Sequence, residues 1–126
     1  MKLLFLLILV PLHTLCSYAQ NLEVPQKEFT LSVSHAVVEL SGGETRKEEI
    51  KILKSKGYQK SKVKMGLSSS LPQGISITFN PDNGNFDLTE AIITVLPDVK
   101  PGQYSVILNA TMNNKTKASV LKITIP

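Results

Sequence analysis

The chain has 126 residues, of which 42% are hydrophobic and 19% charged, with a formal net charge of +4 and one cysteine. A single cysteine excludes an intramolecular disulfide, so the fold must be held by its core alone. About a hundred residues suffice for one domain and not for two. There is no tryptophan, and the few aromatic residues offer little stacking surface for single strands, so we expect no nucleic-acid partner.

The first residues form a targeting signal. Lys2 supplies a positive charge, residues 3–10 are an unbroken apolar run, and Ser17-Tyr18-Ala19 places small side chains around a cleavage site. We predict a signal peptide over residues 1–19. The protein is then expected to be exported and to be periplasmic, outer-membrane-associated or extracellular.

Cys16 leaves a second interpretation of this segment open, because a bacterial lipoprotein is cut just before a cysteine that then carries the lipid. The preceding His13-Thr14-Leu15 lacks the small residue that such a site requires, so the sequence favours ordinary cleavage. In either case the apolar run is far shorter than the ~20 residues that span a bilayer, and we expect no transmembrane anchor.

Alternating apolar residues dominate the rest of the chain. After a short leader over residues 20–27, polar turns separate brief apolar runs of period two, which is the pattern of half-buried strands. We predict a single domain over residues 28–126. Its expected strands cover residues 29–33 with a continuation at 38–40, then 45–53, 63–67, 75–79, 91–96, 104–110 and 118–125.

The segment 45–53 allows two interpretations. Glu48, Ile50 and Ile52 share one parity, which indicates a strand, whereas the abundance of Glu and Lys favours a helix. We favour the strand, because every neighbouring segment has a strand pattern and a lone helix would leave a sheet face uncovered.

Pro101-Gly102 predicts a tight corner before the strand at 104–110, because proline fixes its own φ and glycine permits a positive one. Tyr104 is expected at this corner with its hydroxyl bonded to nearby backbone. Seven or eight short strands, with turns roughly every ten residues, predict an all-β fold, an immunoglobulin-like antiparallel β-sandwich.

Three short motifs resemble those of a known family. Leu71-Pro72-Gln73-Gly74, Phe79-Asn80-Pro81 and Pro101-Gly102-Gln103-Tyr104 are similar to motifs of bacterial immunoglobulin-like modules of secreted hydrolases, including the alpha-galactosidase-associated type. The resemblance implies the sandwich fold and a role as spacer, stabiliser or binding accessory. The Ser-Tyr-Ala-Gln junction resembles cleavage sites common in Bacteroidetes, which implies a bacterial source of that kind.

Catalysis and metal binding find little support. Beyond the signal, His35 is the single imidazole, and Ser68-Ser69-Ser70 lacks the glycine context of a nucleophile, so we expect no enzyme. One histidine without cysteine makes no zinc site, and no cofactor is expected. Asp82, Asn85 and Asp87 bring oxygen ligands for calcium into one loop, although a turn explains this composition equally.

Eight basic residues lie between Arg46 and Lys64, against two acidic ones. In an immunoglobulin-like sandwich, the loops in this segment, around residue 86 and at 113–115 meet at one pole. Exposed aromatic rings among cations and amides would form a binding surface there, although a solvated charged surface is the other interpretation. The predicted binding residues are Lys54, Lys56, Tyr58, Lys60, Phe86, Asn113, Asn114 and Lys115.

Together these features predict an exported, non-catalytic module with a structural or protein-interaction role in the bacterial envelope. Its partner is expected to be a protein or another envelope component. The alternative is a glycan-binding accessory protein that recognises an anionic polysaccharide through the basic pole. Because carbohydrate sites usually use aromatic platforms and tryptophan is missing, the sequence favours the protein partner.

Overall fold

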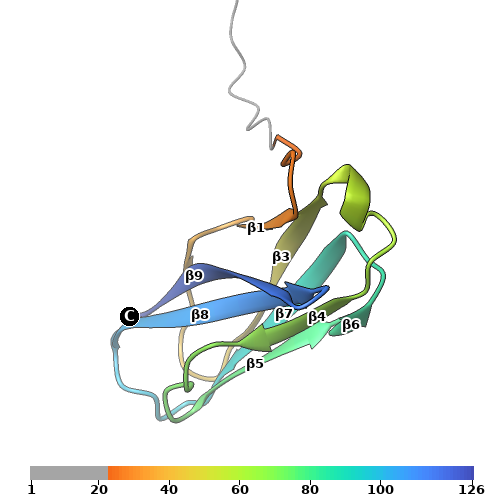
Figure 1. Ribbon diagram of the computed structural model, residues 1–126. Coiled ribbons are helices and arrows are strands. Elements are labelled where there is room, and N and C mark those ends of the chain that lie inside the picture. The colour runs from red at the N-terminus through yellow and green to blue at the C-terminus, as the bar shows by residue number, and fades with distance from the viewer. Residues whose placement is uncertain (1–22) are drawn as a thin grey trace, which may run out of the picture.

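The computed structural model describes residues 23–126 as nine strands and one 3₁₀ turn (Figure 1). The predicted signal peptide and Cys16 lie outside the described residues. The elements are β1 (Phe29–Val33), β2 (Val37–Glu39), β3 (Thr45–Lys54), η1 (Lys56–Tyr58), β4 (Val63–Leu67), β5 (Ile75–Asn80), β6 (Asn83–Gly84), β7 (Leu88–Val95), β8 (Gly102–Met112) and β9 (Lys115–Ile125).

Two sheets form a sandwich. One has the strand order β1-β3-β7-β5 and the other β2-β9-β8-β4-β6, and all strand pairs are antiparallel except β2 with β9. Without β2 and β6, this is the ABED and CFG arrangement of an immunoglobulin-type sandwich. The predicted all-β sandwich is confirmed. The described residues form nine strands instead of seven or eight, because β2 and β6 are short pieces at the sheet edges.

Strand β3 resolves the ambiguity of its charged sequence. It runs from Thr45 to Lys54, so the helical alternative is wrong. Its buried side chains recur at every second position, at Glu48, Ile50, Ile52 and Lys54. Because β1 and β7 pair with β3 on its two sides, tertiary pairing overrides the helical propensity of its Glu and Lys residues.

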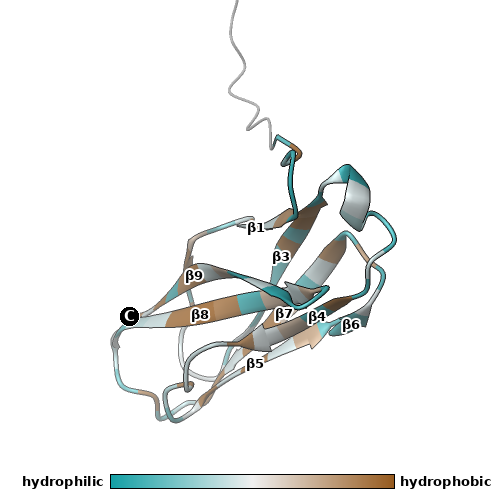
Figure 2. Ribbon diagram, in the orientation of Figure 1, coloured by the Kyte–Doolittle hydropathy of each residue, from teal (hydrophilic) through white to brown (hydrophobic). Residues whose placement is uncertain are grey.

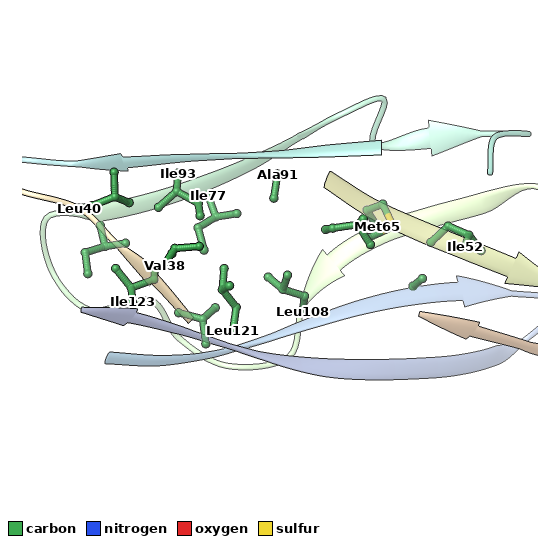
Figure 3. Packing of buried hydrophobic residues seen from close by; sticks show 14 of the residues in the cluster. Val38, Leu40, Ile52, Met65, Ile77, Ala91, Ile93, Leu108, Leu121 and Ile123 are labelled. Carbon is green, nitrogen blue, oxygen red and sulfur yellow. The ribbon is translucent and has the colours of Figure 1, made fainter. Parts of the chain in front are cut away.

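The core lies between the two sheets. Apolar and polar bands alternate along the strands in Figure 2, as expected when one face of each sheet is buried. Ile77 and Ile93 of one sheet pack opposite Leu121 and Ile123 of the other in Figure 3, and all four belong to one buried cluster. Burying such a side chain stabilises the fold by roughly 1.5–3 kcal/mol.

One end of the sandwich, which we call the corner pole, consists of residues 71–74 and 96–104. The predicted corner is confirmed there, since Gly102 has a φ of +155° and the Tyr104 hydroxyl donates to the Lys100 carbonyl at 2.6 Å. A cleft of about 390 Å³ lies between the two segments, and Gly74, Val99 and Tyr104 contribute to its lining. Two of the three family-like motifs therefore meet at this pole.

The other end, which we call the loop pole, consists of residues 55–62, 81–87 and 113–114. The N-terminal segment enters the sandwich here, because the Ser55 N–H donates to the Glu28 carbonyl at 2.8 Å. No helix within residues 23–126 has the length and apolar character needed to cross a membrane.

Candidate functional site

Three connections meet at the loop pole. The Asn113 amide donates to the Ser61 hydroxyl at 2.9 Å, which joins the turn between β8 and β9 to the segment 55–62. Strand β6 pairs with the start of β4 and so brings residues 81–87 beside the same segment. The structure thus gathers the predicted binding residues at one end of the sandwich, but it buries three of them wholly or in part.

Lys54 is not part of the exposed surface, and the prediction that it lies there is wrong. Its side chain is 1% exposed, and its ammonium lies 2.9 Å from Asn85 Oδ1 and 3.3 Å from Asp87 Oδ1. A buried ammonium requires such partners, because it has lost its hydration. Asn85 and Asp87 are two of the three residues considered as calcium ligands. In the structure their side-chain oxygens contact the ammonium of Lys54.

Tyr58 and Phe86 are not the exposed aromatic pair that the sequence predicted. Tyr58 is half-buried, and its ring centroid lies 5.9 Å from that of buried Phe29 at an interplanar angle of 44°. Phe86 is likewise half-buried against the core. The expectation was wrong because burying an aromatic ring against the apolar core at the end of the sandwich is more favourable in free energy than leaving the ring in water.

The remaining predicted residues, Lys56, Lys60, Asn113, Asn114 and Lys115, are exposed at this pole. Asn113 and Asn114 have φ values of +48° and +62°, which direct the tight turn between β8 and β9. We call these five residues the exposed set. They offer ammonium and amide groups on loops held by a rigid sandwich, and their role in binding stays a prediction.

The rest of the basic segment is divided between the two sheets. Lys47 and Lys51 are exposed on β3, in the four-stranded sheet, whereas Lys64 is exposed on β4, in the five-stranded sheet. The eight basic residues between Arg46 and Lys64 therefore do not form one basic face. The part of this segment that lies at the loop pole is residues 55–62.

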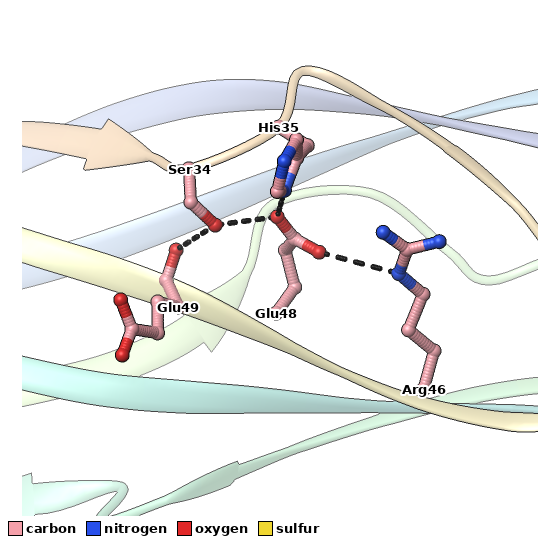
Figure 4. A network of polar contacts seen from close by, with 5 residues as sticks. All are labelled: Ser34, His35, Arg46, Glu48 and Glu49. Carbon is pink, nitrogen blue, oxygen red and sulfur yellow. Dashed lines mark hydrogen bonds and ion pairs between the residues drawn. The ribbon is translucent and has the colours of Figure 1, made fainter.

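A network that the sequence analysis missed surrounds Glu48, whose side chain is 2% exposed (Figure 4). Glu48 Oε1 lies 2.5 Å from Ser34 Oγ and 2.6 Å from His35 Nδ1, and Oε2 lies 3.5 Å from Arg46 Nε. Burial raises the pKa of Glu48, but hydrogen bonds from Ser34 and His35 and the charges of His35 and Arg46 bring it below 4.5. The network therefore holds the connection between β1 and β2, where the chain passes from the four-stranded to the five-stranded sheet.

This network contains a serine, a histidine and a glutamate, but not in the geometry of a nucleophile and its base. Ser34 and His35 both contact the carboxylate of Glu48, whereas a catalytic hydroxyl must contact the imidazole. Within residues 23–126, no three His, Cys, Asp or Glu side chains are grouped to hold a metal ion.

Neither a protein-family model nor a curated protein matches the sequence. Solved structures show similar folds. A putative alpha-galactosidase from Bacteroides fragilis matches with a TM-score of 0.53 and 16% identity, over 83% of this chain and 19% of that chain. A conjugative transposon lipoprotein from Bacteroides eggerthii matches with a TM-score of 0.55 and 10% identity, over 75% of this chain and 95% of that chain.

A family 123 glycoside hydrolase from Clostridium perfringens is also similar, with a TM-score of 0.52 and 12% identity over 79% of this chain and 27% of that chain. This chain thus spans a small part of either hydrolase but nearly the whole length of the lipoprotein. At such identities the likeness shows the fold alone, an all-β domain that occurs within long enzymes and in a small lipoprotein.

Proposed function

We propose that this chain is an exported, non-catalytic module that acts in the bacterial envelope by contacting a protein through the loop pole. The observation that carries the proposal is the gathering of the exposed set on two adjoining connections, the segment 55–62 and the turn between β8 and β9, at one end of a rigid sandwich. Binding residues are commonly placed on loops that a scaffold holds in position. At the corner pole, by contrast, Gly74 packs closely against Val99 and Tyr104 donates a hydrogen bond to the Lys100 carbonyl, so these motif residues serve the fold.

The fold neighbours support the envelope as the place of action. They include a lipoprotein and a putative alpha-galactosidase, both from Bacteroides, and the predicted signal peptide agrees with export. An accessory role follows more naturally than catalysis, because His35 is the single imidazole in residues 23–126 and its Nδ1 contacts Glu48. We expect no turnover of chromogenic glycosides or peptides, and turnover that His35→Ala abolishes would overturn this part.

Photo-crosslinking tests the loop pole as a protein-binding surface. A photoreactive phenylalanine analogue replaces Lys60 in one variant and Lys47, which is exposed on β3, in the matched control. After irradiation with the envelope fraction of the producing bacterium, we expect one defined protein adduct from position 60 and none from position 47. Equal adducts at both positions, or none at position 60, would contradict the proposal.

A second candidate, recognition of an anionic polysaccharide, is supported by the ammonium groups of Lys56, Lys60 and Lys115. Because Tyr58 and Phe86 are half-buried, such a glycan would be held mainly by charge, and salt would weaken its binding strongly. Affinity electrophoresis in alginate distinguishes the candidates. Retention at low salt that Lys56→Ala with Lys60→Ala removes, together with the absence of a protein adduct, would favour the glycan.

A further inference from the structure

Strand β5 is a sheet edge without the usual protection. In residues 23–126 it pairs with β7 alone, and its six residues make it longer than the other edge strands, β1, β2 and β6. Its sequence, Ile-Ser-Ile-Thr-Phe-Asn, contains no charged residue, proline or glycine. Proteins usually block such edges with charges, prolines, bulges or very short strands, so this edge is open to another strand.

The ladder shows which backbone groups face the open edge. The Leu96 N–H donates to the Gly74 carbonyl at 2.8 Å, next to the pair of Ile75 with Val95. Gly74 and Leu96 are therefore a hydrogen-bonded pair. Because hydrogen-bonded and non-hydrogen-bonded pairs alternate along an antiparallel ladder, Ser76, Thr78 and Asn80 bond to β7. Ile75 and the alternate residues that follow it therefore direct their N–H and C=O groups outward.

Of these outward groups, the Ile75 N–H is used within the chain, because it donates to the Pro72 carbonyl at 3.1 Å. Within residues 23–126, the Ile75 carbonyl and both backbone groups of Ile77 and Phe79 remain for a further strand. The side chains of these residues lie toward the core, Phe79 being half-buried at its margin. Ser76 and Thr78 are exposed on the outer face.

We propose that a second copy of this chain pairs with β5, antiparallel about a two-fold axis at Ile77, and extends the four-stranded sheets of both copies into one of eight strands. In this register Ile77 lies opposite its own copy, Ile75 opposite Phe79, and Ser76 opposite Thr78. Aromatic pairs with β-branched residues and pairs of hydroxyl residues are both favourable across strands, and no charges meet.

A second copy fits this edge better than an unrelated strand, because the sequence is complementary to itself about Ile77. A two-fold contact uses the same edge of both chains, so the assembly closes at two copies. Pro81 follows β5 directly and ends the available edge. The inference does not rest on the proposed function, because β5 lies outside the loop pole and the two are tested separately.

Sedimentation equilibrium of the purified chain tests the dimer. We expect a concentration-dependent dimer that Ser76→Lys with Thr78→Lys weakens at least about tenfold, because lysines would then oppose each other across the two-fold axis. The control, Thr30→Lys with Thr45→Lys, adds the same charge to exposed positions of β1 and β3 and is expected to leave the dimer intact. Unchanged thermal melts show that both variants fold.

Cysteine cross-linking tests the register, in a Cys16→Ser background. Ser76→Cys with Thr78→Cys creates non-hydrogen-bonded pairs between copies, whose Cα atoms are expected about 4.5 Å apart, close enough for disulfides. We expect a covalent dimer on mild oxidation. In the Thr78→Cys single variant, the Cα atoms of the two copies of residue 78 would lie beyond the ~7 Å limit for a disulfide, and the chain is expected to stay uncrosslinked.

Three results would overturn the proposal. They are a chain that is monomeric at all concentrations, a dimer that persists in the double lysine variant, and efficient cross-linking of Thr78→Cys alone. A monomeric chain that instead binds a synthetic peptide with the β5 sequence of alternating apolar and hydroxyl residues would show that the edge accepts a strand without forming the dimer.

Discussion

The corner pole and the loop pole are built by different chemistry. At the corner pole, backbone conformation and close packing fix the structure: Gly74 has a φ of +88°, and a Cβ there would lie 2.5 Å from Val99 Cγ2. At the loop pole, side-chain contacts hold the loops, from Lys54 to Asp87 and from Asn113 to Ser61. The corner pole is therefore expected to tolerate few substitutions at Gly74 and its neighbours, whereas the loop pole also exposes lysines, Lys56 and Lys60, beside the side chains that hold its loops.

This difference explains why the family-like motifs and the candidate binding residues lie at opposite ends. Gly74 and Tyr104, each in one of the motifs, serve the fold itself, through the close approach of Gly74 to Val99 and the hydrogen bond of Tyr104 to Lys100, so these two residues need no ligand to explain their place. Four variants follow, from the largest expected effect to the smallest. Three of them test this contrast, and Glu48→Gln tests the network at the change of sheet, which belongs to neither pole.

Gly74→Ala is expected to lower the free energy of unfolding by about 3 kcal/mol, because alanine combines a left-handed backbone with a close contact to Val99. Urea denaturation measures the loss. Gly57→Ala at the loop pole is the matched control, since a Cβ there meets nothing within 4 Å, and it should change stability by less than about 0.5 kcal/mol. Equal effects at both glycines would contradict the contrast between the poles.

Asn85→Ala with Asp87→Ala is expected to lower the free energy of unfolding by about 2 kcal/mol, because it leaves the buried ammonium of Lys54 without its partners. Adding Lys54→Met to the double variant should restore most of the stability, since the apolar chain fills the same space. If Lys54→Met restores nothing, the ion contacts are not what holds this end of β3.

Glu48→Gln is expected to lower the free energy of unfolding at neutral pH by about 1 to 2 kcal/mol and to reduce its dependence on pH. The pKa of Glu48 is lowered in the folded state, so its stabilisation is present above the ordinary pKa of a glutamate and is lost as the pH falls through the lowered pKa of the folded state. Chemical denaturation between pH 3 and 7 measures the change. The hydrogen bond to Lys117 and the charge of Lys117 lower the pKa of Glu28. Glu28 therefore contributes to the pH dependence of stability that remains in the Glu48→Gln variant.

Tyr104→Phe is expected to lower the free energy of unfolding by about 1 kcal/mol, because it removes one hydrogen bond to the Lys100 carbonyl. Photo-crosslinking from position 60 should be unchanged in this variant. Loss of the adduct in a normally folded Tyr104→Phe protein would mean that the corner pole takes part in binding.

Much of the fold was predictable from the sequence, because one buried face per sheet imposes a burial period of two on the longer strands, such as β3, β7 and β8. The corner before β8 was predictable for the same local reason, since Pro101 and Gly102 restrict the backbone directly. The convergence of the loops followed from the topology. The change of sheet between β1 and β2 was not foreseen, because it depends on the parallel pairing of β2 with a strand at the far end of the chain.

The candidate site was less predictable, because burial near the ends of a strand depends on distant partners. Lys54 shares the parity of Ile50 and Ile52, and this pattern was the available signal that its side chain points inward. The half-burial of Tyr58 depends on Phe29, which precedes it by many residues, and no local pattern reveals that contact.

The two ends of the described chain leave the sandwich at opposite poles. Glu28 joins it at the loop pole, whereas Ile125, the register partner of Gly102, lies at the corner pole. A tether upstream of the sandwich would therefore hold the exposed set toward the tethering surface, and a tether downstream would present it outward. An affinity tag fused after Pro126 keeps the loop pole unobstructed, and copies joined in tandem would be connected from the corner pole of one to the loop pole of the next.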